Sequence, residues 1–395
     1  MELTMKHARV SVAGLAMLLG ACATVKPVPV TPATTPPAPA INPFADAQLF
    51  VNPEYTKAVQ GLIPAHAGEA EMLKKLSVIP TAIWLSWIAD TKDVPRYLDL
   101  ALQQQKAAGK PVITTFVVYD LPNRDCNAAA SAGELPASPE GEARYQREYI
   151  DAIAAAFAAH PDQRIAAILE PDSVGNLITN LENPKCQAAE GIYKRGIAYA
   201  IAKLSLPNVF LYIDAAHGGW LGWPKNIVKA GPMFKEILTM AGGPDRIRGF
   251  ATDVSNYNPA KDPTNPKRDP HAAPSDELGY IVDLNKALEA EGITGKGFII
   301  DTSRGGKAYI RTSPGNWCNI KGAGLGERPQ AAPAPLVDAY LWVKPPGESD
   351  GVADPKAERF DQNCASEDAA PGAPQAGKMF DSYVIDLLKN ATPPL

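Results

Sequence analysis

Histidine is scarce in this sequence of 395 residues, with only five copies. They are scattered singly and no His-Glu-x-x-His spacing occurs, so the sequence does not favour a metal-dependent hydrolase, and we expect no metal and no other cofactor. The Gly-x-Ser-x-Gly motif is also missing, which argues against a serine hydrolase. A glycine-rich stretch at 321–329 follows no clear strand and opens no helix, so we interpret it as a loop and not as a phosphate site.

Clustered positive charge is missing as well. Lys and Arg number 38 against 43 Asp and Glu, for a formal net charge of −5, which gives no electrostatic footprint for nucleic acid. With 46% hydrophobic residues the chain can bury a large core. We find no internal repeat and no second linker, so we expect one folded domain at 42–395, as a monomer.

The N-terminus has only a short hydrophobic run. Lys6 and Arg9 precede VSVAGLAMLLGA at 10–21, which is too short to span a bilayer as a mature helix and is typical of a signal peptide. The ending LLGAC predicts a bacterial lipoprotein signal at 1–21 with Cys22 lipidated, so that the lipid anchor is the only membrane contact, at the outer membrane or cell surface. An alternative is cleavage at the Ala-x-Ala pattern of 21–23, which would give a secreted or periplasmic protein. Residues 22–41 are rich in Pro, Thr and Ala and are expected to form an extended tether.

The chain has five cysteines, an odd number. Lipidation of Cys22 would explain the leftover one and leave four in the folded part: Cys126, Cys186, Cys318 and Cys364. Export permits disulfides, and of the three possible pairings we favour the one between neighbours in the sequence, Cys126–Cys186 and Cys318–Cys364. The alternative is that one or both pairs stay reduced.

Apolar runs alternate with longer amphipathic stretches from residue 79 onwards. Strands are expected at 79–87, 111–122, 164–173, 208–217, 247–258, 297–304 and 338–348. Helix-like segments lie at 93–109, 141–160, 189–204 and 275–292, the last with Ser275 and Gly292 as candidate caps. This alternation predicts an α/β fold with right-handed crossovers, a parallel sheet and a seven-stranded β/α barrel of the TIM-like kind.

Each expected strand ends in polar residues. These are Trp84 and Ser86; Tyr119, Asp120, Arg124 and Asp125; Glu170 and Asp172; Asp214 and His217; Asp253 and Asn256; Asp301 and Arg304; Lys344, Glu348 and Asp350. In a barrel the C-terminal ends of the strands meet on one face, where active sites lie. Any one ending could instead cap a helix or form a turn, but seven together predict one active site.

The candidate groups are mostly carboxylates accompanied by tryptophans, a combination that suits sugar chemistry. Glycosidic cleavage needs a protonated acid and a second carboxylate, and aromatic faces suit pyranose rings. Trp84, Trp220, Trp223, Trp317 and Trp342 lie at or beyond expected strand ends. Core packing is the alternative for each indole, and it is the better interpretation for Trp342, which lies inside an apolar run.

Several motifs together resemble those of glycoside hydrolase family 6, the inverting cellulases. In order they are NPFADAQLFVNPEY, VVYDLPNRDCNAAASAGE, ILEPDSVGNLITN, YIDAAHGGWLGWP, ATDVSNYN, NWCN and WVKPPGESDG. The resemblance covers residues 42–395. It implies a distorted barrel of seven parallel strands with the active site at their C-terminal ends, in agreement with the count above.

The resemblance implies roles for three aspartates. Asp172 would be the general acid, and burial or a like charge must raise its pKa for it to keep its proton. Asp125 would be the neighbouring carboxylate that does so and supports the positive transition state. Asp350 resembles the carboxylate proposed as base, either directly or through water. Inversion needs room for water, with carboxylates roughly 6.5–9.5 Å apart.

Other positions also match the family. Arg124 would orient Asp125, Tyr119 would press on the distorted sugar, and Ser131 would help hold the attacking water. The predicted substrate-binding residues are Trp84, Ser86, His217, Trp220, Trp223, Asn256, Trp317, Lys344 and Glu348. Ser86 departs from the family, which commonly has Trp-Leu-Asp where this chain has Trp-Leu-Ser.

Two long loops bear on the mode of action. The family pairs the equivalents of Cys126 with Cys186 and of Cys318 with Cys364, and these bridges hold the loops at 126–145 and 345–377. In that family, long loops roof the groove into a tunnel and go with release of cellobiose from chain ends. By this resemblance we expect an exported β-1,4-glucanase acting on cellulose or cello-oligosaccharides with inversion, in the manner of a cellobiohydrolase. The alternatives are an endoglucanase of the same family and a non-catalytic glucan-binding lipoprotein.

Overall fold

A computed structural model describes residues 41–264, 272–313 and 315–395. These residues belong to the larger of two compact units, Thr35–Leu395. The predicted signal peptide, the predicted lipidation at Cys22 and the whole tether except Ile41 lie outside the described residues. Within the described ranges, no helix is both long enough and apolar enough to cross a bilayer.

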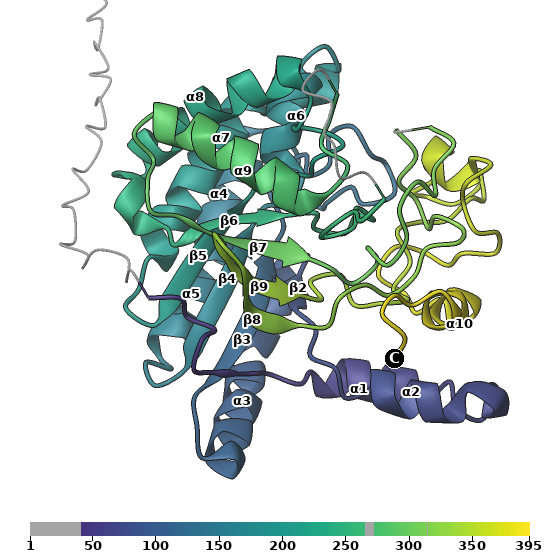
Figure 1. The fold of residues 1–395 in the computed structure, drawn as a ribbon. Coiled ribbons are helices and arrows are strands. Elements are labelled where there is room, and N and C mark those ends of the chain that lie inside the picture. The colour runs from purple at the N-terminus through teal and green to yellow at the C-terminus, as the bar shows by residue number, and fades with distance from the viewer. Residues whose placement is uncertain (1–40, 265–271, 314) are drawn as a thin grey trace, which may run out of the picture. The chain divides into compact units, whose positions relative to one another are not determined.

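A single mostly parallel sheet forms the centre of the described unit (Figure 1). Its order is β1-β3-β4-β5-β6-β7-β9-β8, and β2 pairs with β3 beside β1. Only β8 runs antiparallel to its neighbour β9. The strands are β1 (Gln48–Leu49), β2 (Ile83–Leu85), β3 (Val112–Val118), β4 (Arg164–Leu169), β5 (Val209–Asp214), β6 (Gly249–Thr252), β7 (Gly297–Asp301), β8 (Gln330–Ala334) and β9 (Val337–Leu341).

The apolar strands are covered on both faces, which explains their continuous hydrophobic runs. In β3, Val112, Phe116 and Val118 belong to the large core under the helices. Ile113 and Val117 alternate with them and belong to a second core on the concave side of the sheet. That inner core also receives side chains from the other long strands, including Ala166, Ile168, Tyr212, Ala251, Ile299, Ala339 and Leu341.

The prediction of seven parallel strands in a distorted barrel is confirmed, by β2, β3, β4, β5, β6, β7 and β9. The barrel is not closed by a strand ladder between β2 and β9. Two hydrogen bonds cross this seam instead: the Ala82 N–H donates to the Trp342 carbonyl at 3.1 Å, and the Trp84 indole donates to the Val343 carbonyl at 2.8 Å. All seven strands therefore direct their C-terminal ends to the same side.

The four helical segments expected from the sequence are present as α3, α4 with α5, α7 and α9, and others were missed. The helices are α1 (Pro53–Gln60), α2 (Ala70–Leu76), α3 (Val94–Ala108), α4 (Pro139–Arg144), α5 (Asp151–Ala158), α6 (Ser173–Thr179), α7 (Pro184–Leu204), α8 (Pro224–Met240), α9 (Glu277–Ala290) and α10 (Asp381–Lys389). Short helical turns are η1 (Ala67–Glu69), η2 (Ile88–Asp93), the π-helical η3 (Tyr145–Ile150), η4 (Pro244–Arg246) and η5 (Gln362–Ala365). Residues of α1, α2 and α10 share a separate apolar core, and these helices lie together in Figure 1.

The cap expected at the start of α9 was wrong by one residue. Asp276, not Ser275, is the N-cap, and its carboxylate accepts the Gly279 N–H at 2.7 Å. At the other end Gly292 has a φ of +79°, in the left-handed conformation typical of a residue after a helix. The segment at 321–329 is a loop, as expected.

Candidate active site

A cavity of 1340 Å³ lies where the strands end. It is lined by all fifteen residues that the sequence singled out for catalysis or sugar binding: Trp84, Ser86, Tyr119, Arg124, Asp125, Ser131, Asp172, His217, Trp220, Trp223, Asn256, Trp317, Lys344, Glu348 and Asp350. The fold thus brings these residues together, and their individual roles stay predictions.

Unusual backbone conformations mark the turns that carry these residues. Eleven non-glycine residues in the described ranges have a positive φ, and seven of them follow β3, β4, β5 or β6: Asn123, Asp125, Glu170, Asp172, Ala216, Asp253 and Ser255. Such conformations cost on the order of 1–3 kcal/mol each and persist where the surroundings enforce them. The strained turns therefore coincide with the polar strand ends.

Asp172 follows β4 at the N-cap of α6, with a φ of +65°, but its side chain makes no capping hydrogen bond. The carboxyl is therefore available to the cavity that it lines. Burial raises the pKa of Asp172 well above its usual value, and the charges of Asp125, Asp214 and Asp350 raise it further. This environment favours the protonated form of the Asp172 carboxyl group.

Asp125 follows β3 and is 7% exposed. The Tyr119 hydroxyl donates a hydrogen bond to Asp125 Oδ2. Burial raises the pKa of Asp125, while hydrogen bonds with Ser131 and Tyr119 and the charge of Arg124 offset part of that shift. Two neighbouring acids with raised pKa values, Asp125 and Asp172, thus face the cavity.

Arg124 shapes the turn that carries Asp125. Its Nη1 donates to the carbonyls of Ser86 and Tyr119, both at 2.5 Å, and its Nε donates to the Ser131 carbonyl at 2.9 Å. The guanidinium also lies 4.3 Å from the centre of the Tyr119 ring. Arg124 therefore ties together the ends of β2 and β3 and the loop of Ser131, and acts on the Asp125 carboxylate through its charge.

Asp350 has a contrasting environment. Arg304 Nη1 contacts both of its oxygens, at 2.9 and 2.8 Å, and Lys344 Nζ lies 3.4 Å from Oδ1. The Tyr257 hydroxyl and the Asn319 N–H also donate to Oδ2, at 2.8 and 2.9 Å. Burial opposes ionisation, but the charges of Arg304 and Lys344 outweigh it and lower the pKa of Asp350. An ionised carboxylate with so many donors is a weak base.

Indoles line the cavity around these acids. The Trp220 indole donates to Thr179 Oγ1 at 2.8 Å, and its ring lies so close to Gly175 that a Cβ there would meet it at 2.9 Å. The Trp223 indole donates to the Gly219 carbonyl at 3.0 Å and is 37% exposed. Trp317 packs against the Cys318–Cys364 bridge. By contrast, Trp342 is only 1% exposed and belongs to the hydrophobic core, which confirms core packing as the better interpretation of this indole.

Lys344 and Glu348 follow β9 on the same side. Lys344 Nζ lies 5.8 Å from the centre of the Trp84 ring. Burial raises the pKa of Glu348 to about 7, and the charge of Lys344 opposes this shift. The cavity therefore also holds an acid that changes charge near neutral pH.

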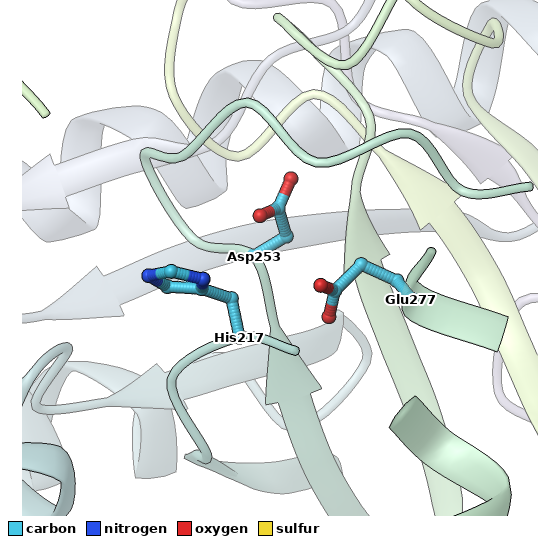
Figure 2. Close-up of side chains that lie close together, drawn as sticks. All are labelled: His217, Asp253 and Glu277. Carbon is cyan, nitrogen blue, oxygen red and sulfur yellow. The ribbon is translucent and has the colours of Figure 1, made fainter. Parts of the chain in front are cut away.

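His217, Asp253 and Glu277 lie close together, with one potential ligand atom each within 4.8 Å of one another (Figure 2). An amide already occupies this cluster, because Asn258 Nδ2 contacts Glu277 Oε1 at 2.7 Å and His217 Nδ1 at 3.3 Å. Arg311 donates to the Oδ1 of the same amide at 3.1 Å. We interpret the cluster as a hydrogen-bonded network, and the expectation that no metal is needed stays a prediction.

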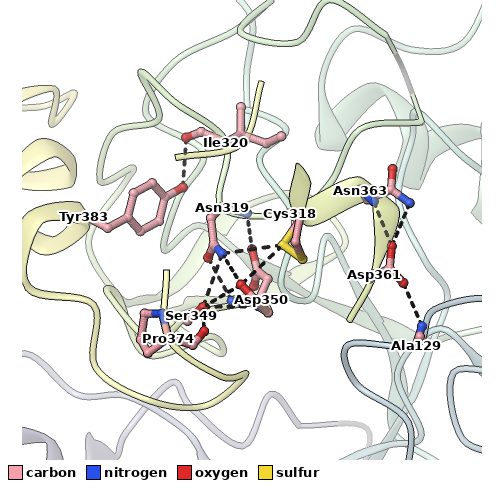
Figure 3. Close-up of a disulfide and its surroundings, with 12 residues drawn as sticks. Ala129, Cys318, Asn319, Ile320, Ser349, Asp350, Asp361, Asn363, Pro374 and Tyr383 are labelled. Atoms are coloured by element: carbon pink, nitrogen blue, oxygen red, sulfur yellow. Dashed lines mark hydrogen bonds between the residues drawn. A yellow bond between two sulfur atoms is a disulfide. The ribbon is translucent and has the colours of Figure 1, made fainter. Parts of the chain in front are cut away.

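Both predicted disulfides form, Cys126–Cys186 and Cys318–Cys364, each with a Cα–Cα distance of 4.9 Å. The two long loops also touch each other. The Ala129 N–H donates to Asp361 Oδ2 at 2.7 Å (Figure 3). Ala130 packs against Gly351, where an added Cβ would lie 2.5 Å from that of Ala130.

Sequence reasoning missed several residues at the cavity. Asp90 lines it and accepts the N–H groups of Ser86 and Trp87, at 2.8 and 3.0 Å. Arg311 also lines it, from a loop with no recognisable motif. Asp90 sits four residues after Ser86 and could have been found from that local spacing, whereas Arg311 reaches the site only through tertiary structure.

Glycosidic bonds are cleaved between a pair of carboxyl groups, and in α/β barrels the active site lies at the C-terminal ends of the strands, so the position of Asp125 and Asp172 fits a glycoside hydrolase. The family profile described as Glycosyl hydrolases family 6 matches residues 44–391. The chain therefore belongs to glycosyl hydrolases family 6, and the resemblance found in the sequence is confirmed.

Named relatives agree with this assignment. The chain is 41% identical over 360 residues to a 1,4-β-D-glucan cellobiohydrolase C of Emericella nidulans, covering 89% of this chain and 79% of that protein. It is 42% identical over 360 residues to a putative endoglucanase type B of Fusarium oxysporum, covering 89% and 77%. The solved structure of cellobiohydrolase II (Cel6A) from Humicola insolens with glucose and cellotetraose has a TM-score of 0.85 at 39% identity, covering 90% of this chain and 100% of that one.

Proposed function

We propose that the protein is an exported β-1,4-glucanase that hydrolyses cellulose chains or cello-oligosaccharides with inversion, with Asp172 as the general acid. The observation that carries the proposal is the buried acid pair of Asp125 and Asp172 in an indole-lined cavity at the strand ends. The relatives named as glucan-degrading enzymes support the choice of substrate.

In the proposed reaction, Asp172 gives its proton to the glycosidic oxygen as the bond breaks, and water attacks the anomeric carbon from the opposite face. Asp125 stabilises the positive charge that develops on the sugar, and Tyr119 holds Asp125 through its hydroxyl. Ser131 lines the cavity beside them, where it can hold the attacking water.

Asp350 fits the role of an electrostatic anchor better than that of a direct base. Its donors from Arg304, Lys344, Tyr257 and Asn319 occupy both oxygens, and its pKa is lowered. We propose that the proton of the attacking water leaves through other water molecules, while Asp350 fixes the position of Lys344 and of the second long loop.

Proton NMR of the first products from cellohexaose tests the reaction type. An α-anomer formed first supports inversion, and a β-anomer formed first contradicts it. The Asp172→Asn variant should lose hydrolysis by a factor of about 10² to 10⁴ and retain binding, whereas the matched Asp245→Asn variant, at an exposed position before β6, should behave as wild type. Wild-type protein that binds cellohexaose without cleaving it would favour the non-catalytic alternative.

We further propose the cellobiohydrolase mode of action. The contact between the two long loops, through Ala129 and Asp361, supports a roof over the cavity. Cellobiose release with little loss of viscosity on carboxymethylcellulose would agree with this proposal. A rapid fall in viscosity would favour an endoglucanase, the activity in the name of the Fusarium oxysporum relative.

We also propose that Cys22 carries a lipid anchor and that residues 22–41 tether the enzyme to a bacterial outer membrane or cell surface. The sequence LLGAC and the proline-rich segment support this, and the two disulfides suit an oxidising compartment. Labelling with a palmitate analogue should mark the wild type and not Cys22→Ser. An unlabelled wild-type protein in the medium would favour the secreted form.

A further inference from the structure

Arg311 reaches the cavity from the loop between β7 and β8. Its Nη2 donates to Asn256 Oδ1 at 2.5 Å and to Asn258 Oδ1 at 3.1 Å, and its Nη1 donates to the Asn316 carbonyl at 3.3 Å. A guanidinium has only donors. Both amides must therefore turn their Oδ1 toward Arg311. The NH₂ group of each amide then faces away from Arg311.

The Asn256 amide is held by two donors. Its Oδ1 accepts Arg311 Nη2 and also the Tyr257 N–H, the latter at 2.9 Å. Both lone pairs of this oxygen are thereby used. Asn256, which is 9% exposed and lines the cavity, can offer only its Nδ2 hydrogens to a ligand there.

The orientation of the Asn258 amide determines which nitrogen of the His217 ring carries the proton. Because Asn258 Oδ1 faces Arg311, its Nδ2 faces Glu277 Oε1 at 2.7 Å and His217 Nδ1 at 3.3 Å. An NH₂ group can only donate, so Nδ1 must accept and the proton of a neutral ring lies on Nε2. In Figure 2 the outer nitrogen of the His217 ring points away from both Asp253 and Glu277.

The charges around the ring are consistent with a neutral His217. Burial lowers the pKa of His217 well below its usual value, and the charge of Arg311 lowers it further. The acids that face the ring, Asp253 and Glu277, are themselves buried, and burial raises the pKa of both. The ring thus stays neutral, and its tautomer is set by the Asn258 contact.

We propose that Arg311 is a positioning residue of the glucan site, which locks the Asn256 amide and, through Asn258, the Nε2–H tautomer of His217. Both side chains then present N–H donors to hydroxyl oxygens of a neutral sugar. The identity of the ligand rests on the proposed function, whereas the tautomer does not.

The tautomer can be measured without activity. Long-range ¹H–¹⁵N spectra of ¹⁵N-histidine-labelled protein distinguish the two ring nitrogens, and the His217→Gln variant assigns the signal among the five histidines. The wild type should show the Nε2–H form at pH 7. Arg311→Met should show a mixture of tautomers, with a KM for cellohexaose raised about tenfold and kcat nearly unchanged, since it weakens binding of substrate and transition state alike.

Two further variants sharpen the test. Arg311→Lys keeps the charge, but its ammonium nitrogen ends one bond short of the position of Nη2, which bonds both amides, so the mixed tautomer and the raised KM should persist. Asn258→Asp places a carboxylate oxygen against His217 Nδ1 and should move the proton of the ring to Nδ1. This variant tests the contact between residue 258 and His217 even if the Arg311 variants fail to fold. Arg328→Met is the matched control. Like Arg311, Arg328 donates to a backbone carbonyl, and its guanidinium lies 5.6 Å from the centre of an aromatic ring, that of Trp342, as the guanidinium of Arg311 lies 5.6 Å from the ring of Tyr257.

An Nδ1–H form in the wild type would overturn the proposal, as would an unchanged tautomer and KM in Arg311→Met. Full recovery by Arg311→Lys would also overturn it, because charge alone would then suffice. A wild-type protein with the expected tautomer but no glucan hydrolysis would reject the proposed function and leave the hydrogen-bond relay intact.

Discussion

The backbone N–H of Asp172 donates a 3.0 Å hydrogen bond to Oδ2 of Asp214. The same oxygen accepts the Ala216 N–H at 3.0 Å, and within the described residues Oδ1 has no hydrogen-bond partner. Burial raises the pKa of Asp214 to about 7. Asp214 thus holds the backbone turn of Asp172, the predicted general acid, and its own carboxyl group is a second acid beside Asp172.

Asp214→Asn should shift the pH dependence of catalysis. The amide oxygen can still accept the N–H of Asp172, but the charge that helps to raise the pKa of Asp172 is gone. The pKa of Asp172 should fall, so the loss of kcat at high pH should begin at a lower pH than in the wild type. Profiles of kcat on cellohexaose measure this, with Asp245→Asn as control. The prediction would be contradicted if the loss of kcat at high pH began at the same pH as in the wild type or at a higher pH.

Asp350→Asn should lose activity without rescue by a small anion. The change leaves Arg304 and Lys344 without their carboxylate partner, which should also lower stability by roughly 3–5 kcal/mol. Because Asp350 is not the direct base in our proposal, added azide should neither restore turnover nor form a glycosyl azide. Product analysis with azide checks this, and an α-glycosyl azide would show that Asp350 activates the water directly.

Asp361→Ala should open the roof over the cavity. It removes the acceptor of the Ala129 N–H and so loosens the contact between the two long loops. The variant should lower the viscosity of carboxymethylcellulose faster, relative to cellobiose release, than the wild type does. Asp354→Ala is the control, because Asp354 is an exposed residue of the same loop that bonds to its neighbour Lys356. An equal ratio in all three proteins would show that this contact does not govern access.

Asp120→Asn should change how stability depends on pH. Asp120 is fully buried, neither oxygen has a hydrogen-bond partner among the described residues, and Arg124 lies 3.6 Å away. Burial raises the pKa of Asp120 to about 9, against about 3.9 in an unfolded chain. Between these values the folded state holds a proton that the unfolded state has lost, so the free energy of unfolding falls as pH rises through this window.

The variant removes this contribution, so its free energy of unfolding should fall less between pH 5 and pH 9 than that of the wild type. Urea unfolding at several pH values measures it, with the exposed Asp162→Asn as control. Other buried acids with a pKa raised to about 7 act in the same direction and remain in the variant: Glu170, Asp214, Glu277 and Glu348. A slope equal to that of the wild type would contradict the prediction.

The strands were predictable because parallel strands buried on both faces need unbroken apolar runs, as VITTFVV in β3 shows. The acids were predictable because each follows such a run directly, so local sequence already places Asp125 and Asp172 at strand ends. Helix α8 was missed because Gly231 and Pro232 interrupt its pattern. The N-cap of α9 is Asp276 and not Ser275. Serine and aspartate are both favoured at this position, so residue type alone could not distinguish the two neighbours.

The contacts of Arg311 could not be predicted in this way. Its partners Asn256 and Asn258 lie more than fifty positions earlier in the chain, and no local pattern links them. Likewise, the donors around Asp350 come from four separate segments, at Tyr257, Arg304, Asn319 and Lys344. Residue type identifies candidate groups, whereas their protonation and orientation depend on neighbours that only the folded chain supplies.

Trp84 joins two parts of the molecule with one side chain. Its indole N–H holds the seam between β2 and β9, where no strand ladder exists, and its ring meets Tyr119 edge to face with centroids 5.2 Å apart. In the binding mode predicted from the sequence, a glucan chain would pack on this ring, at the place where two neighbouring barrel strands share no ladder. Glucan bound at Trp84 would then be expected to stabilise the seam between β2 and β9.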